Sequence, residues 1–112
     1  MSVSFYGTQE VVLSFEADTV TNGYPVVVSQ NNQVSDAQDG AVPVGVALHV
    51  RQDIAAVQVK GYLELPYTET APSLGWARIV ANGQGGVKSA PEGLSCLLVN
   101  IDTDSKTVGL YL

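Results

Sequence analysis

Hydrophobic and polar residues alternate most strictly over residues 56–66. Apolar residues and glycine occupy one side of this stretch, namely Val57, Val59, Gly61, Leu63 and Leu65. Mostly polar residues occupy the other, namely Gln58, Lys60, Tyr62 and Glu64. A period of two with β-branched and aromatic residues predicts one half-buried strand. Pro66 is predicted to end it, because proline has no N–H group to donate to the ladder.

Six further stretches are typical of strands: residues 10–15, 24–30, 43–51, 76–81, 94–101 and 107–112. Turn pairs such as Asn22-Gly23 and Asn31-Asn32 separate them, since Asn and Gly accept positive φ at little cost. Residues 68–75 have no periodicity and are predicted to form a loop, and no window has the apolar spacing of a helix. The pattern therefore predicts an all-β fold. We expect a small compact barrel or sandwich of short antiparallel strands, with little or no helix.

The chain of 112 residues suits one domain. We expect residues 1–9 to form an N-terminal arm and residues 10–112 to form a single β domain, and no internal repeat is visible. The first residues lack the basic and apolar regions of a secretion signal. The apolar runs are too short to span a bilayer.

Charged residues make up only 14% of the chain, against about 25% in typical soluble domains. So few charges favour a protein that covers part of its surface with a partner. The net charge is −6, and the five basic residues are scattered along the sequence. Without a basic stripe to neutralise phosphates, binding to nucleic acid or to an anionic membrane is not expected.

The residues that most often carry chemistry have structural interpretations here. Cys96 lies in an apolar run and is predicted to be a buried small hydrophobe. His49 is the only histidine, which leaves Cys96 without a plausible base partner. Asp102 and Asp104 lack the central Gly and the final Glu of a calcium loop, so a hairpin turn is predicted. We therefore expect no catalytic residues, no cofactor and no metal, and we do not expect an enzyme.

Aromatic residues near the central loop leave two interpretations open. Tyr62, Tyr67 and Trp76 are either part of the core or anchors of an interface, where such residues are enriched. Together with Phe5 and Tyr6 of the N-terminal arm, they form the candidate interface.

The order of short motifs along the chain provides a further indication. G-x-P-V occurs at 23–26, P-V-G-V-A at 43–47 and V-x-V-x-G-x-x-E-L-P at 57–66. Gly75-Trp76, a glycine-rich hairpin at 83–86 and a C-terminal hairpin follow. This order, over residues 17–112, resembles the small phage head decoration proteins, also described as cement or capsid-stabilising proteins. Trp76 departs from the pattern, because many such chains have a polar residue after the glycine.

The resemblance implies a β-rich homotrimer without enzyme activity or cofactor. It implies that the major capsid protein is the partner, bound on the outside of an icosahedral head that the trimer stabilises. The protein would then be made in the host cytoplasm and reside on the capsid surface of the virion. The alternative is a virion-exposed β module that binds carbohydrate or host, in which Tyr62, Tyr67 and Trp76 stack on sugar rings.

Overall fold

The computed structural model describes residues 10–68 and 72–112, which form ten strands and contain no helix. The strands are β1 (Val11–Ala17), β2 (Pro25–Gln30), β3 (Gln33–Asp36), β4 (Gly45–Arg51), β5 (Ile54–Lys60), β6 (Tyr62–Pro66), β7 (Gly75–Ala81), β8 (Val87–Ser89), β9 (Leu94–Asp102) and β10 (Thr107–Tyr111). The all-β prediction is confirmed. β3 departs from the predicted antiparallel arrangement, since it runs parallel to β1 with Glu16 opposite Gln33.

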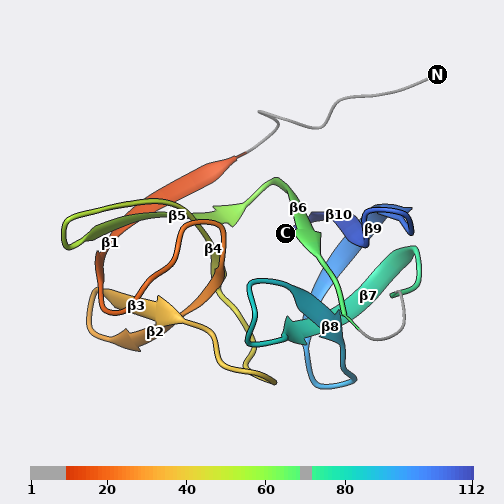
Figure 1. Ribbon diagram of the computed structural model, residues 1–112, viewed down its shortest axis with the longest axis horizontal. Coiled ribbons are helices and arrows are strands. Elements are labelled where there is room, and N and C mark those ends of the chain that lie inside the picture. The colour runs from red at the N-terminus through yellow and green to blue at the C-terminus, as the bar shows by residue number, and fades with distance from the viewer. Residues whose placement is uncertain (1–9, 69–71) are drawn as a thin grey trace.

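The ten strands form two sheets that lie side by side along the long axis of the molecule (Figure 1). The first five close into a barrel in the order β1-β3-β2-β4-β5, with β5 paired back to β1. The last five form a sheet in the order β6-β10-β9-β7-β8. A bridge between Tyr67 and Val87 joins the end of β6 to β8, so this sheet is also almost closed. Closure protects backbone groups that an open edge would expose.

The pairing scheme of the first barrel is repeated in the second sheet. In each half the first strand pairs with the fifth, the fifth with the fourth, the fourth with the second and the second with the third. The third strand then runs parallel to the first, in the second half through the Tyr67–Val87 bridge. The hairpins of the fourth and fifth strands match residue by residue, because three pairs are followed by one skipped residue, Leu48 in β4 and Val99 in β9. The fold is thus a tandem duplication of one five-stranded topology, and we call its halves the first and second barrels.

Side chains at equivalent core positions differ between the two barrels. By the matching registers, Ala55 and Val57 of β5 take the places of Val108 and Leu110 of β10, and all four are fully buried. The first barrel therefore has the smaller core residues. Because the equivalent residues are not identical, the duplication is visible in the strand pairing and not in the sequence.

Gly61 separates two strands where the sequence predicted one. β5 ends at Lys60 and β6 begins at Tyr62, and Gly61 between them has a φ of 111°, a region that favours glycine. A Cβ at this position would lie 2.8 Å from Cγ of Glu10. The prediction of a single strand over 56–66 is therefore wrong, because the alternation continues across the break and hides it. The predicted end of the strand at Pro66 is confirmed.

The two barrels meet at a closely packed junction. Pro25 and Val46 of the first barrel line a cavity of about 10 Å³ together with Leu63 and Leu110 of the second. That volume leaves barely the space of one water molecule. Val46 belongs to the same buried cluster as the core of the second barrel. The junction is thus continuous with that core.

Backbone hydrogen bonds add to the junction. The Gly40 N–H donates to the carbonyl oxygen of Ala81 at 2.8 Å, and the Ala81 N–H donates to that of Ala41 at 2.9 Å. Because the linker between the barrels is a single residue, Gly61, these bonds and the apolar contact hold the two barrels in one arrangement.

Candidate functional site

The aromatic residues of the candidate interface are found in different places. Phe5 and Tyr6 lie outside the described residues. Tyr62 and Tyr67 are buried, with exposed fractions of 4% and 6%, whereas Trp76 is 76% exposed. The two interpretations of the aromatic cluster therefore divide between its members: the tyrosines belong to the interior and the tryptophan to the surface.

Tyr62 stabilises the second barrel from within. Its hydroxyl group donates to Oε2 of Glu64 at 2.9 Å and accepts a hydrogen bond from Nδ2 of Asn100 at 3.0 Å. A Cβ at Gly109 of β10 would collide with the Tyr62 hydroxyl oxygen. Tyr62 therefore lies over this glycine and joins β6 to β9 and β10, as expected for a buried tyrosine whose hydroxyl group is satisfied.

Tyr67 continues the chain beyond Pro66 and closes the second sheet. Its N–H donates to the carbonyl oxygen of Lys106 at 3.0 Å, and the residue is bridged to Val87 of β8. Its side chain belongs to the buried cluster of the second barrel. Tyr67 is therefore a core residue and not a side chain offered to a partner.

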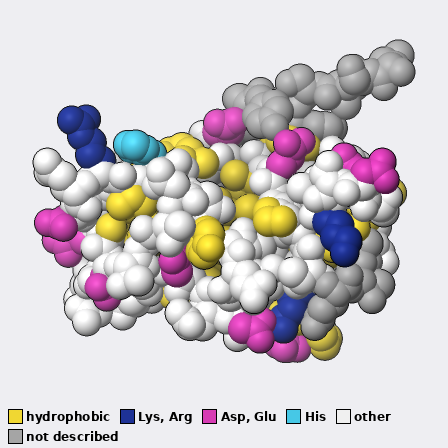
Figure 2. Space-filling view, in the orientation of Figure 1, with side chains coloured by type: hydrophobic (Ala, Val, Ile, Leu, Met, Phe, Trp, Pro, Cys, Tyr) yellow, Lys and Arg dark blue, Asp and Glu magenta, His cyan; other side chains and the backbone are white. Residues whose placement is uncertain are grey.

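Trp76 stands on β7 opposite Leu97 of β9. Leu74, two residues earlier, is 62% exposed. Other large apolar residues with exposed side chains are Val11, Val12, Leu13, Val28, Val42, Val44, Leu48 and Ile54. Figure 2 shows hydrophobic side chains at the surface in the middle of one face, with acidic side chains spread around them. An aromatic side chain held by a strand and open to solvent has the geometry of an interface anchor.

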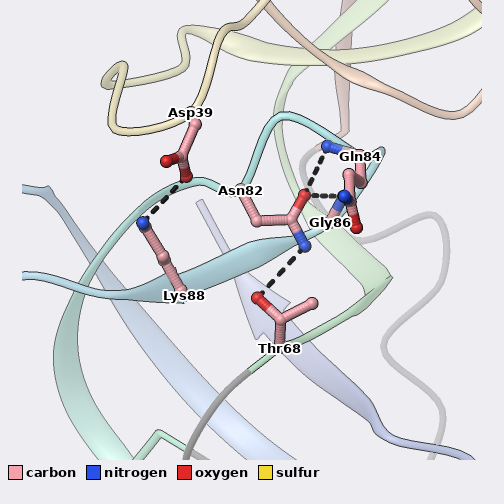
Figure 3. Close-up of polar contacts among 6 residues, drawn as sticks. All are labelled: Asp39, Thr68, Asn82, Gln84, Gly86 and Lys88. Atoms are coloured by element: carbon pink, nitrogen blue, oxygen red, sulfur yellow. Dashed lines mark hydrogen bonds and ion pairs between the residues drawn. The ribbon is translucent and has the colours of Figure 1, made fainter.

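A polar hollow lies beside the hairpin that connects β7 to β8 (Figure 3). Oδ1 of Asn82 accepts hydrogen bonds from the backbone N–H groups of Gln84 at 2.7 Å and Gly86 at 3.0 Å. Nδ2 of Asn82 donates to Oγ1 of Thr68 at 3.4 Å. Asn82 therefore fixes the turn that its pairing with glycine predicted, and its amide group is used in doing so.

The hollow also contains an ion pair between the barrels. Nζ of Lys88 on β8 lies 2.8 Å from Oδ1 of Asp39 in the loop between β3 and β4. The hollow has a volume of about 480 Å³ and is lined by Gln38, Asp39, Thr68, Asn82, Gly83, Gln84 and Lys88. Among the described residues that line it, none is a Cys or His that could serve nucleophile-and-base chemistry. The Asp39–Lys88 ion pair instead connects the two barrels.

Cys96 lies where the sequence interpretation placed it. Cys96 is buried, and burial raises the pKa of its thiol to about 11, so the unreactive thiol form dominates at neutral pH. The prediction of a buried Cys96 is confirmed. His49 is exposed on the outer side of β4.

Asp102 begins the tight turn between β9 and β10. Its Oδ1 accepts the backbone N–H groups of Ser105 at 3.2 Å and Asp104 at 3.0 Å. These hydrogen bonds hold the pKa of the carboxyl group below its usual value, and the one from the Ser105 N–H has the largest effect. The predicted hairpin turn is confirmed. Within residues 10–68 and 72–112, no three His, Cys, Asp or Glu residues are grouped so that they could hold a metal ion.

Sequence reasoning missed the exposed apolar residues of the first barrel. Leu13 of β1 is 46% exposed although it faces Val57, which is fully buried. The sequence feature that could have revealed them is the unbroken apolar run from Val11 to Leu13. A strand with three consecutive apolar residues presents apolar side chains on both faces.

No protein-family model matches the chain, and no curated protein is significantly similar to it. The resemblance to phage head decoration proteins therefore rests on the order of motifs in the sequence. Within the part of the chain that the structure describes, no helix is long and apolar enough to cross a membrane.

Proposed function

We propose that this protein is a structural component of a phage particle, a decoration protein that binds the outside of the head as a homotrimer and stabilises it. The observation that supports this most is the set of large apolar side chains, led by Trp76, that the two firmly joined barrels hold at the surface. The small share of charged residues and the order of motifs point the same way.

The physical basis of such stabilisation is buried area across the seams between shell subunits. A protein that contacts two subunits at once adds interface that must be lost before they separate. If it binds the assembled shell better than the free subunits, mass action favours the shell. Rigid barrels suit this task, because little conformational entropy is lost when they dock.

The test uses shells of the phage that encodes this chain, assembled without it. The purified chain is added, and the fraction that sediments with the shells is measured, followed by the temperature at which the shells break. We expect saturable co-sedimentation and a higher breaking temperature. A chain that stays in the supernatant at every concentration contradicts the proposal.

The second candidate, a carbohydrate-binding module, is favoured by one observation, the exposed indole of Trp76. Stacking on a sugar ring requires such a face, but Tyr62 and Tyr67 are buried and do not extend it. Titration of Trp76 fluorescence with host surface glycans tests this candidate. A saturable change that is lost in Trp76→Ala supports it, and an unchanged spectrum contradicts it.

A further inference from the structure

The contact between the two barrels is built from two cross-strand pairs. The first barrel contributes Pro25 of β2 opposite Val46 of β4. The second contributes Leu63 of β6 opposite Leu110 of β10. All four residues are buried and line the small cavity at the junction. One barrel thus covers the apolar mouth of the next.

The duplication gives the Pro25–Val46 pair a counterpart in the second barrel. That counterpart is Trp76 opposite Leu97, because Val46 and Leu97 each lie two residues before the skipped residue of their hairpin. We call the Trp76–Leu97 pair the plug.

The Leu63–Leu110 pair has a counterpart in the first barrel. It is Leu13 opposite Val57, because Val57 and Leu110 are each the fourth residue of the last strand of their barrel. We call the Leu13–Val57 pair the open mouth.

Burial differs sharply between these counterparts. Leu63 is 7% exposed at the junction, whereas Leu13 is 46% exposed. Pro25 is buried at the junction, whereas Trp76 is 76% exposed. One residue of each copied pair is therefore exposed, Leu13 in the open mouth and Trp76 in the plug, whereas Val57 beneath Leu13 is fully buried.

Side-chain volume also differs between the counterparts. The plug carries Trp76 in place of the smaller Pro25, and the open mouth carries Val57 in place of the larger Leu110. The exposed residue of the plug is thus a larger apolar side chain than its counterpart at the junction, as expected of an anchor that docks on a partner.

We propose that the plug of one copy of this chain docks on the open mouth of a second copy and so repeats the internal contact between molecules. The occupant is a second copy because, within the chain, a barrel of the same topology covers the equivalent mouth. The contact joins two different surfaces and leaves one of each free, so further copies add in the same direction until a ring closes. With the trimer of the proposed function, on which this step rests, the ring would contain three plug-and-mouth contacts.

The first experiment measures the mass in solution by light scattering at micromolar concentration. The wild type is expected to be an oligomer, and Trp76→Glu and Leu13→Glu are each expected to abolish the closed ring and reduce the mass to that of one chain. Ile54→Glu is the matched control, since Ile54 is 51% exposed and belongs to neither pair. It should retain the wild-type mass. Circular dichroism verifies that each variant is folded, and serine replaces glutamate at any position where it is not.

The second experiment mixes the two single variants in equal amounts. Trp76→Glu retains the open mouth and Leu13→Glu retains the plug, so the mixture should form a dimer of one copy of each. A contact in which one surface meets itself gives no such dimer. The proposal is overturned if the wild type is monomeric, if the variants keep the wild-type mass, or if the mixture stays monomeric. If the chain assembles only after residues 2–9 are deleted, the first residues of the same chain are the occupant of the open mouth. That result would also overturn the proposal.

Co-sedimentation with shells separates this inference from the proposed function. An oligomer that assembles through the two pairs but never binds shells refutes the proposed function and leaves the contact between copies. A monomer that decorates shells refutes the contact and the homotrimer, and it leaves the decoration of the head.

Discussion

The substitution Gly109→Ala tests how Tyr62 holds the second barrel together. A Cβ at Gly109 would collide with the Tyr62 hydroxyl oxygen and lie 2.7 Å from Nδ2 of Asn100. Gly109 is not among the residues with positive φ, so the substitution causes no backbone strain of that kind. The effect is therefore a steric one between side chains, and it can be worked out from the contacts.

Two contributions of opposite sign determine the magnitude. Forcing extra volume into a packed site costs about 1–3 kcal/mol. The lower entropy of the unfolded chain with alanine returns about 0.4–1 kcal/mol. If the Tyr62 ring moves aside, its hydrogen bonds to Glu64 and Asn100 weaken as well. We expect Gly109→Ala to lower the free energy of unfolding by about 1–2 kcal/mol.

The first barrel supplies the matched control. Ala56 occupies the position equivalent to Gly109, and Val12 occupies that of Tyr62, so the Tyr62 hydroxyl group has no counterpart at this position. Ala56→Gly should change the free energy of unfolding by no more than about 1 kcal/mol.

Urea unfolding at one fixed protein concentration, followed by far-ultraviolet circular dichroism, gives the required values, since self-association would shift them. Trp76 is too exposed to report on the core by fluorescence. In the double variant with Tyr62→Phe, the loss should be smaller than the sum of the single losses by about 0.5 kcal/mol or more. Additive losses, or a Gly109→Ala variant as stable as the wild type, would refute the reasoning.

Three further predictions concern Cys96, Gly61 and Tyr67. Burial raises the pKa of Cys96 from 9.0 to about 11, so its contribution to stability is complete below pH 9 and is lost as the pH rises toward 11, because the unfolded thiol ionises first. In urea titrations over this range, Cys96→Ala should lose less stability with pH than the wild type, and parallel pH profiles would contradict this. Gly61→Val should lower the free energy of unfolding by about 1–3 kcal/mol, through strain and contact together. Gly75→Val should lower the free energy of unfolding less, because Gly75 also has positive φ but nothing lies within 4 Å of its Cβ position. Equal melting temperatures for the two variants would contradict this difference. Tyr67→Ala should cost about 3–5 kcal/mol in urea unfolding, as expected when a buried aromatic side chain is removed. A loss within the range of surface substitutions, about 0.5 kcal/mol, would show that Tyr67 is not part of the core.

Local residue chemistry predicted much of the fold. The turn at Asn22-Gly23 and the strand end at Pro66 depend on which φ angles and hydrogen bonds a residue permits, and the structure contains both. The break at Gly61 was not predictable from periodicity, because the apolar residues keep their spacing on either side of it. The duplication was not predictable either, since it depends on which strands pair, and that is decided by contacts distant in sequence.

The candidate site was only partly predictable for a related reason. β7 alternates only in its first half, where Trp76 and Arg78 are exposed, and it ends in three consecutive buried residues, so the alternation is too short to place Trp76 from the sequence alone. Tyr62 occupies the polar side of its alternating stretch and is nevertheless buried, because its hydroxyl group finds partners in Glu64 and Asn100.

Val46 is part of the first barrel but packs in the core of the second, and this affects the order in which the two barrels fold during synthesis. The core of the first barrel, with the partly buried side chains packed against it, uses only residues between Phe15 and Val59. The core of the second barrel includes Val46, which is synthesised earlier. Because domains generally fold in the order in which they emerge, the first barrel has its full core before the second is translated. The second half then folds against a surface already in place, and the time during which its apolar strands are uncovered is short.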